Sequence, residues 1–367
     1  MKRIGIYYDS LRPGRGTHGT HLAFTGLPDV ELVLADPNPE PPYLDKIGAV
    51  RRYPSFDEMM EKEDLSVVVL GSRLPEDHYD PMKKALSRGI HVFCEKPVSS
   101  ELSELDELTA LAKKNHCLVA PAHLARYSRV FRTLRRCVES GMIGTPLTFY
   151  GRGKEDERGG GEDLLVLGTH ILDIGCMLFG KPESLSAEVW QNGRPLAKGD
   201  HLPTEEPMGL VAGDDISVRL RFPNGVNGVF ESRRDMYDGS KVRMSVTVVG
   251  TKGSLSVCYD KKRLVRFSPA RCFAGDESVW ETIPFDPLPE IPGAAPLHEE
   301  WFCMWYFAEG NREAARNLLA AIDGREELSC RIEDARDTQE IINGIYLSAL
   351  EDRRIHFPLT NRDNPLR

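Results

Sequence analysis

Short apolar runs alternate with helical patterns through the first 120 residues, and this alternation constrains the fold more than any other feature of the chain. The apolar runs are RIGIYY, VELVLAD, LSVVVLGS, GIHVFCEKP and HCLVAPAH. Before the last of them, SSELSELDELTALAKKN repeats its leucines at helical spacing. Strands that alternate with helices are typical of βαβ units, so we expect a parallel sheet in this part of the chain.

After residue 180 the pattern changes to strand-like segments separated by glycine and proline turns, as in DDISVRLRFPNGVNGVFESRR. Asn224-Gly225 is a strong hairpin signal, and Gly250 to Gly253 indicates another turn. This part is therefore predicted to form a mostly antiparallel sheet. Because 367 residues exceed the usual size of one hydrophobic core, we expect two domains, 1–122 and 123–367, with the alternative that the C-terminal helices pack back on the first domain.

Composition restricts the class of partner. The net charge of −9 and the pI near 5.7 disfavour a general nucleic-acid binder, since the chain has no basic excess to neutralise phosphates. No apolar run is long enough to span a membrane, and the opening MKRIGIYYDS leads directly into a strand, so we expect a cytoplasmic protein. The eight cysteines show no metal-site spacing, so no metal centre is expected. A small molecule is the expected partner.

The segment GRGTHG contains the glycine pattern of a dinucleotide-binding turn, with Gly14, Gly16 and Gly19 in the three glycine positions. Asp36 follows at the end of the second predicted strand, where an acid suits a ribose 2′-hydroxyl and repels a 2′-phosphate. These residues predict NAD as the cofactor, in preference to NADP. The strand before them ends near Tyr8, with DSLRP in between, so the alternative is a glycine-rich surface loop.

The stretch GGGEDLLVLGTHILDIG runs from a glycine triplet into an amphipathic helix that carries His170 and Asp173 one turn apart. Glu162 and Asp163 lie just upstream, and Asp163 falls seven residues before His170 on the same helix face. Two turns, roughly 10.5 Å of rise, exclude a direct hydrogen bond between the two side chains but allow both to reach one bound substrate or a metal between them. The alternative is that Asp163 caps the helix and Glu162 is solvated.

Three motifs together resemble one family. They are EKP at 95–97 after the fourth strand, AHLARYSRVFRTL after the fifth, and the glycine triplet followed by G-x-H-x-x-D. In this combination the chain is similar to the glucose-fructose oxidoreductase, inositol dehydrogenase and rhizopine-catabolism family, written Gfo/Idh/MocA. The resemblance implies a Rossmann-like N-terminal domain and a C-terminal α/β domain with an open sheet. It also implies an NAD(P)-dependent dehydrogenase or reductase of sugars, cyclitols or polyols, which forms a homodimer or homotetramer through that sheet.

The resemblance also implies roles for individual residues. Lys96 matches the lysine that contacts substrate and helps to transfer the hydroxyl proton, and its place at the carboxyl edge of a parallel sheet suits a ligand crevice. Glu95 is expected to orient Lys96 or to touch the nicotinamide ribose, which places both residues among the cofactor contacts. His170 matches the catalytic histidine. The substrate contacts expected besides these are Glu162, Asp163, Asp173, His123 and Arg126.

One position departs from the family pattern. Val166 stands where members carry an aspartate that completes a proton relay, and a hydrocarbon side chain can neither accept nor donate a proton. We therefore predict an NAD-dependent oxidoreductase with Lys96 and His170 at the reacting centre, and keep two alternatives. One is an NAD-assisted lyase or glycoside-cleaving enzyme without net redox change, and the other is a non-catalytic NAD-binding protein. For His123 and Arg126 a structural role at the domain junction also stays open.

Overall fold

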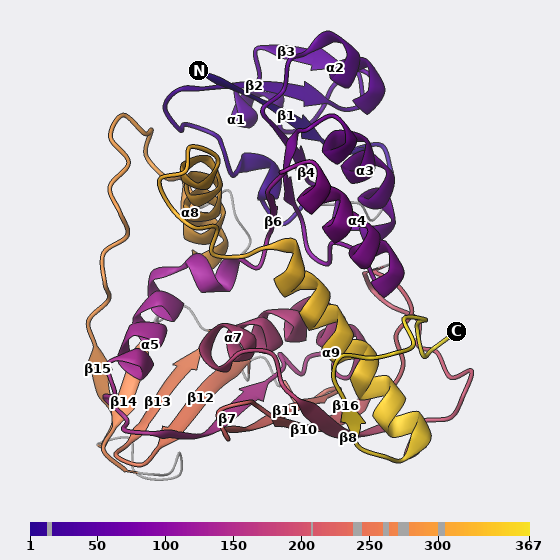
Figure 1. Cartoon of the computed structure of the whole chain (residues 1–367), viewed down its shortest axis with the longest axis vertical. Helices are drawn as coiled ribbons and strands as arrows, with labels where there is room; N and C mark the ends of the chain where they lie inside the picture. The colour runs from indigo at the N-terminus through magenta and orange to yellow at the C-terminus, as the bar shows by residue number, and fades with distance from the viewer. Residues whose placement is uncertain (13–16, 207, 238–243, 260–263, 271–278, 300–304) are drawn as a thin grey trace. The chain divides into compact units, whose positions relative to one another are not determined.

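The computed structural model describes residues 1–12, 17–206, 208–237, 244–259, 264–270, 279–299 and 305–367 (Figure 1). These residues divide into two compact units, the first made of 1–128 with 288–336 and the second of 129–287 with 337–367. The prediction placed a single boundary after residue 122. In the structure the segment 288–336 belongs with the N-terminal unit, and the last change of unit falls inside helix α9, Ile332–Glu351.

The first unit contains a parallel sheet, as predicted, with six strands among the described residues in the order β3-β2-β1-β4-β5-β6. The strands are β1 Lys2–Tyr7, β2 Val30–Ala35, β3 Arg51–Tyr53, β4 Val67–Leu70, β5 His91–Cys94 and β6 Val119–Pro121. Every residue of β4 is buried, which is the reason that this strand is a continuous apolar run. The Rossmann-like prediction for this region is confirmed.

The helices that connect these strands are η1 Thr20–Leu22, α1 Leu44–Ile47, α2 Phe56–Lys62, η2 Pro75–Asp77, α3 Tyr79–Ser87 and α4 Leu102–Lys114. The first unit also contains η3 Leu124–Tyr127, after the last strand, and α8 Trp305–Ile322. The side chain of Ser55 accepts a hydrogen bond from the backbone N–H of Glu58 and so caps α2. Helix α8 packs closely on η3, because a Cβ at Gly310 would lie 2.5 Å from the carbonyl oxygen of Leu124.

The second unit contains a ten-stranded sheet within the described residues, and all but one of its strand pairs are antiparallel. Its strands are β7 Pro146–Arg152, β8 Ser184–Gln191, β9 Arg194–Pro195, β10 Asp215–Arg221, β11 Asn227–Arg233, β12 Ser245–Gly250, β13 Ser254–Cys258, β14 Val265–Ser268, β15 Glu281–Ile283 and β16 Ile355–His356. The parallel pair is β7 with β11. The predicted hairpin at Asn224-Gly225 joins β10 to β11, and Gly225 has the positive φ that this turn requires.

The sheet of the second unit has one covered and one open face. Along β10, the side chains of Ile216, Val218 and Leu220 are buried, whereas those of Ser217 and Arg219 are exposed. Helices α5, Arg129–Glu139, and α7, Thr169–Phe179, lie on the same side of this sheet (Figure 1). The alternation follows from this one-sided cover, because strand side chains point to opposite faces in turn. No helix in the described part of the chain is long and apolar enough to cross a membrane.

Candidate active site

Lys96 lies in a buried turn directly after β5. Its side chain and that of Glu95 are each about 1% exposed, and the Lys96–Pro97 peptide bond is cis. In a parallel sheet the carboxyl ends of the strands form one edge, where ligands bind. The sequence prediction that Lys96 stands at this edge of the first unit is therefore confirmed, whereas its contact with substrate or cofactor stays a prediction.

The carboxylate of Glu95 is held by three donors. His18 Nδ1 lies 3.3 Å from Oε1, the backbone N–H of Lys96 donates to the same oxygen at 3.0 Å, and the hydroxyl of Thr20 donates to Oε2. Burial opposes ionisation, but the hydrogen bond and charge of His18 and the charge of Lys96 outweigh it and lower the pKa of Glu95 to about 2. Glu95 is therefore an ionised carboxylate that contacts His18 and Thr20.

His78 supports the same turn, and sequence reasoning missed it. Its ring is fully buried, with Nε2 2.8 Å from the carbonyl oxygen of Ser72. Nδ1 lies 3.1 Å from the carbonyl oxygen of Pro97 and 3.2 Å from that of Val98. The imidazole thus links the segment after β4 to the turn that carries Lys96. The only signal in the sequence is a histidine soon after the fourth strand, which by itself does not distinguish this role from a surface position.

Asp36 occupies the predicted position at the end of β2 and is fully buried. Oδ1 accepts hydrogen bonds from the backbone N–H groups of Asn38 at 2.9 Å and Ser10 at 3.2 Å. Among the described residues Oδ2 has no hydrogen-bond partner, and neither has the buried hydroxyl of Tyr8. Orphaned polar atoms of this kind are rare. An acceptor at the end of β2 beside a phenol hydroxyl fits the ribose hydroxyls of NAD.

The glycine-rich turn departs from the usual dinucleotide pattern. Gly14 and Gly16 lie outside the described residues, and Gly19, with φ near 94°, precedes η1. This helix has only three residues, so the described part of the turn lacks the long helix whose N-terminus commonly holds a pyrophosphate. His21 of η1 is buried between the rings of Tyr8 and Tyr43. Burial lowers the pKa of His21 to about 3, so this side chain is neutral.

His123 and Arg126 contact the segment 329–334 of the same unit. The Arg126 guanidinium donates to the carbonyl oxygen of Ser329 at 2.7 Å and lies 3.4 Å from Asp334 Oδ1. His123 Nδ1 lies 3.9 Å from the thiol of Cys330. These contacts support a structural role for His123 and Arg126. The contact of the two residues with substrate stays a prediction.

In the second unit, the glycine triplet is explained by close backbone packing. A Cβ at Gly159 would overlap the backbone of Arg233, one at Gly160 the carbonyl oxygen of Gly213, and one at Gly161 that of Ala212. Gly160 also has φ near 90°, which favours glycine. The triplet therefore allows the chain to pass directly against the residues around β10 and β11 before the helix begins.

The helix that follows contains a π-helical turn, η4, at Leu164–Gly168. Val166 lies in it and is buried, and a Cβ at Gly168 would lie 2.9 Å from the ring of Phe230 in β11. The mid-helix glycine thus lets the helix approach the sheet. His170 and Asp173 follow in α7, and both are fully buried. Lys96 and His170 belong to different units, so their convergence on one cleft stays a prediction.

The two acids upstream of His170, Glu162 and Asp163, are both buried. The alternative prediction of a solvated Glu162 is therefore wrong. Glu162 accepts hydrogen bonds from the backbone N–H groups of Glu206 at 2.9 Å and Glu205 at 3.0 Å. Asp163 Oδ2 accepts from the hydroxyl of Ser232 at 2.6 Å, and Asp163 makes no side-chain hydrogen bond that caps η4. Burial raises the pKa of Glu162, and it raises that of Asp163 to about 6. Their predicted contact with substrate remains untested.

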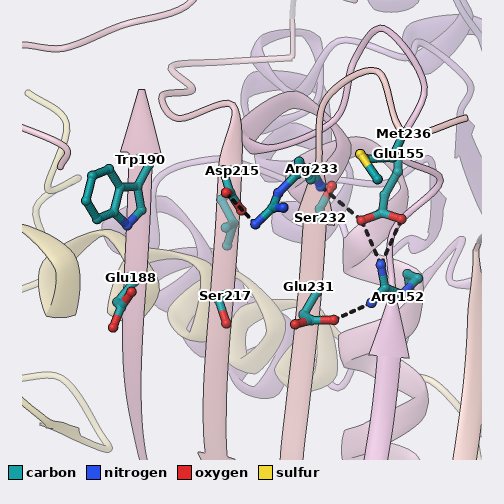
Figure 2. Close-up of a pocket in the computed structure, with 11 residues that line it drawn as sticks. Arg152, Glu155, Glu188, Trp190, Asp215, Ser217, Glu231, Ser232, Arg233 and Met236 are labelled. Atoms are coloured by element: carbon teal, nitrogen blue, oxygen red, sulfur yellow. Dashed lines mark hydrogen bonds and ion pairs between the residues drawn. The ribbon is translucent and has the colours of Figure 1, made fainter. Parts of the chain in front are cut away.

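A polar hollow of about 590 Å³ lies on the open face of the second unit's sheet (Figure 2). Ion pairs cross it: Arg152 contacts Glu155 and Glu231, and Arg233 contacts Asp215 at 2.7 Å. Figure 2 shows Arg152, Asp215, Glu231 and Arg233 on neighbouring strands and Glu155 on the loop after β7, with Trp190 at one side. None of the predicted site residues lines this hollow. Its lining carries two arginines and four carboxylates, those of Glu155, Glu188, Asp215 and Glu231, so acidic groups are in excess.

Two family models match the chain. The model described as "Oxidoreductase family, NAD-binding Rossmann fold" (GFO_IDH_MocA) matches residues 32–123, and the GFO/IDH/MocA C-terminal domain matches residues 131–256. Together they cover more than half of the chain. The first model includes Asp36, Glu95 and Lys96, so the first unit carries an NAD-binding Rossmann fold.

Curated relatives match over varying lengths. Trans-1,2-dihydrobenzene-1,2-diol dehydrogenase of Bos taurus is 28% identical over 73% of this chain and 74% of its own. Myo-inositol 2-dehydrogenase of Thermotoga maritima is 26% identical over 58% of this chain and 62% of its own. An uncharacterized oxidoreductase of Schizosaccharomyces pombe is 30% identical, but the match covers 38% of this chain and 41% of that protein. The chain thus spans about two fifths of the yeast protein's length.

Solved structures match over nearly the whole chain. Levoglucosan dehydrogenase in complex with NADH and levoglucosan has a TM-score of 0.74 at 19% identity, and the match covers 98% of this chain and 100% of that one. An oxidoreductase from Agrobacterium radiobacter in complex with NAD⁺, L-tartaric acid and magnesium has a TM-score of 0.72 at 15% identity, over 97% and 98%. At this level of identity the likeness shows the fold.

Proposed function

The chain belongs to the Gfo/Idh/MocA family of oxidoreductases, and from this premise we propose that it transfers a hydride between NAD and a hydroxyl-bearing carbon of a sugar, cyclitol or related polyol. The observation that carries the proposal is the buried turn of Glu95 and Lys96 at the carboxyl edge of an NAD-binding sheet. The substrate class is supported by the names of relatives, which include an inositol dehydrogenase and a levoglucosan dehydrogenase.

When NAD is bound, it supplies a hydride acceptor at the nicotinamide ring. Asp36 and Tyr8 would hold the adenosine ribose through the two orphaned oxygens described above. Lys96 would hold the reacting oxygen of the substrate and His170 would lie beside it, so that Lys96, His170 or both handle the hydroxyl proton. Glu162, Asp163, Asp173, His123 and Arg126 are proposed as residues around the substrate.

A net non-redox reaction is the second candidate, and Val166 is the observation that favours it. A buried valine one turn before His170 cannot relay a proton. In such a lyase or glycoside-cleaving cycle, transient oxidation would acidify a neighbouring C–H bond, and the hydride would return in the same turnover. A non-catalytic NAD-binding protein would show no turnover with any polyol.

One experiment separates these candidates. The purified chain is incubated with NAD and a panel containing myo-inositol, levoglucosan, aldoses and glycosides, while reduced nicotinamide and carbohydrate products are measured together. A dehydrogenase accumulates reduced nicotinamide in step with product. A net non-redox enzyme forms product without it. If neither product nor reduced nicotinamide forms with any compound, the enzymatic proposal is contradicted.

We also propose that two copies associate through the open face of the second unit's sheet. The exposed side of β10 presents Ser217, Arg219 and Arg221 beside the polar hollow, and no described helix of this unit lies over it in Figure 1. A sheet face without cover is commonly buried against a partner. Light scattering at micromolar concentration tests the association, and a monomer contradicts it.

A further inference from the structure

A second hollow, of about 370 Å³, lies on the open face of the second unit's sheet, and its charge is opposite to that of the hollow in Figure 2. Its described lining contains three guanidinium groups and no carboxylate. Arg219 and Arg221 come from β10, where they alternate with buried residues, and Arg354 directly precedes β16. All three are exposed, and neither Arg219 nor Arg354 forms an ion pair with any described residue. We call this cavity the arginine hollow and the other one the acidic hollow.

The acidic hollow contains one carboxylate without a counter-charge. Glu188 on β8 is exposed and forms no ion pair with a described residue, whereas the other three carboxylates of the lining each contact an arginine. Trp190 and Met236 line the same hollow and are 38% and 43% exposed. Protein interfaces are enriched in tryptophan, methionine and arginine. Exposed apolar side chains beside an unpaired carboxylate therefore favour a protein surface as the occupant of this hollow.

The two hollows lie at opposite ends of the same strands. In the acidic hollow Ser217 of β10 pairs with Glu188 of β8, and in the arginine hollow Arg219 pairs with Ser186. Directly paired strand residues point to the same face of a sheet, so these four side chains share the open face. Negative and positive charge are therefore separated along the strands.

This separation makes the face complementary to a second copy of itself. A twofold axis that lies between two facing sheets and runs across their strands brings the acidic end of each copy over the basic end of the other. When the axis crosses β10 at position 218, midway between the hollows, Glu188 of one copy lies opposite Ser186 of the other. Arg219 and Arg354 stand on either side of Ser186, because β10 and β16 are the two neighbours of β8 in the sheet.

We propose that the chain dimerises in this register, with Glu188 of each copy held between Arg219 and Arg354 of the other. The proposal rests on the association through the open face proposed above and deepens it by assigning the contacts. The axis repeats each contact, so both arginine hollows receive a carboxylate. A twofold axis parallel to the strands would instead place the basic ends of the two copies together, and like charges across an interface are unfavourable.

Exchange of charge between two variants of the full chain tests this register, with the dissociation constant of the dimer measured by sedimentation. Arg219→Glu places a carboxylate beside Glu188 of the other copy twice in each dimer, and Glu188→Arg places an arginine in each arginine hollow. Either substitution alone should raise the dissociation constant by about 10²-fold or more. An equimolar mixture of the two variants should associate within about tenfold of wild type, because each of the two contacts in the mixed dimer then joins opposite charges.

Two further variants separate the contact from general effects of substitution. Arg219→Gln removes the charge without adding repulsion, so it should weaken the dimer by about tenfold. The matched control is Arg52→Glu, because Arg52 is an exposed strand arginine in β3 of the first unit and forms no ion pair with a described residue. It should leave the dissociation constant unchanged. Restored association in the mixture also shows that both single variants are folded.

The outcomes distinguish the register from the proposals on which it rests. A dimeric wild type whose single variants also stay dimeric overturns the register alone. Restoration in the Arg219→Glu/Glu188→Arg double variant without restoration in the mixture overturns it too, because the two side chains then pair within one chain. A monomeric wild type contradicts the association and the register together, while hydride transfer is still decided by the substrate panel. If that monomer binds inorganic phosphate and Arg219→Glu does not, the occupant of the arginine hollow is a small anion.

Discussion

The hydroxyl of Ser232 donates a 2.6 Å hydrogen bond to Oδ2 of Asp163 and so ties β11 to the residue that precedes the π-helical turn. The backbone N–H of Glu155 donates to the same oxygen at 3.2 Å, and a Cβ at Gly153 would overlap it. Oδ1 has no hydrogen-bond partner among the described residues. The acid that precedes the His170 helix is thus an anchor for three segments of the second unit rather than a helix cap.

The first prediction concerns Asp163→Asn. Because burial raises the pKa of Asp163 from 3.8 to about 6, the folded state binds more protons than the unfolded state between these values. As pH rises from about 4 to 6, the contribution of Asp163 to the free energy of unfolding is therefore lost, by roughly 3 kcal/mol in all. Asparagine does not titrate, so the difference in unfolding free energy between variant and wild type should shift in favour of the variant over this range. Urea unfolding at several pH values measures it, and a constant difference contradicts the assignment.

The second prediction concerns the glycine triplet. Gly160→Ala combines a positive φ with overlap of the Gly213 carbonyl oxygen, so we expect the second unit to lose several kcal/mol of stability or to fail to fold. Gly199→Ala is the matched control, because Gly199 also has a positive φ but no atom within 4 Å of an added Cβ. The Gly199→Ala substitution should lower the free energy of unfolding by only about 1 kcal/mol. Equal thermal stability of the two variants would show that close packing is not the reason for the triplet.

The third prediction concerns His78. His78→Leu removes a buried imidazole whose ring N–H donates to the carbonyl oxygen of Ser72 or of Pro97, so the unfolding free energy should fall by about 1–3 kcal/mol. Because one of these carbonyls belongs to the turn of Lys96, kcat should fall as well. Exposed His116 provides the control variant His116→Gln. Wild-type stability together with wild-type kcat in His78→Leu would contradict the bridging role.

The fourth prediction concerns cofactor choice. With Asp36 at the end of β2, NAD should bind more tightly than NADP, since a carboxylate repels a 2′-phosphate. Asp36→Ser should weaken NAD binding and reduce the preference, because both the acceptor and the repulsion are removed. Calorimetric titration of both cofactors measures this. If the wild type bound NADP as tightly as NAD, the prediction that Asp36 selects NAD would be contradicted.

Several features were predictable because they depend on local pattern. The parallel sheet followed from buried apolar runs such as Val67–Leu70, and the hairpin at Asn224-Gly225 followed from turn chemistry. The family motifs identified the turn of Lys96. The packing of C-terminal helices on the first domain was kept as an alternative, but the bounds 288–336 were not predictable, because helix periodicity does not reveal which partner a helix packs against.

The contacts between distant side chains were also not predictable from the sequence. The contact of His18 with Glu95 joins residues 77 positions apart, and that of Asp163 with Ser232 joins residues 69 positions apart. Nothing in either local sequence indicates its partner. Burial of Glu162 likewise depends on backbone N–H groups more than forty residues away. Such contacts form only when the sheets bring distant segments together.

The central claim is hydride transfer at the buried lysine turn, and the rate of a Lys96→Met variant on the polyol that the wild type oxidises tests it most directly. Losing a positioned acid or base costs about 10²–10⁴ in rate, so kcat should fall by that factor while the affinity for NAD and the melting temperature change little. The His170→Ala variant, measured in parallel, should lose as much in kcat if His170 takes part in proton transfer. It should lose little if His170 only positions substrate. Near wild-type turnover by Lys96→Met would contradict the account.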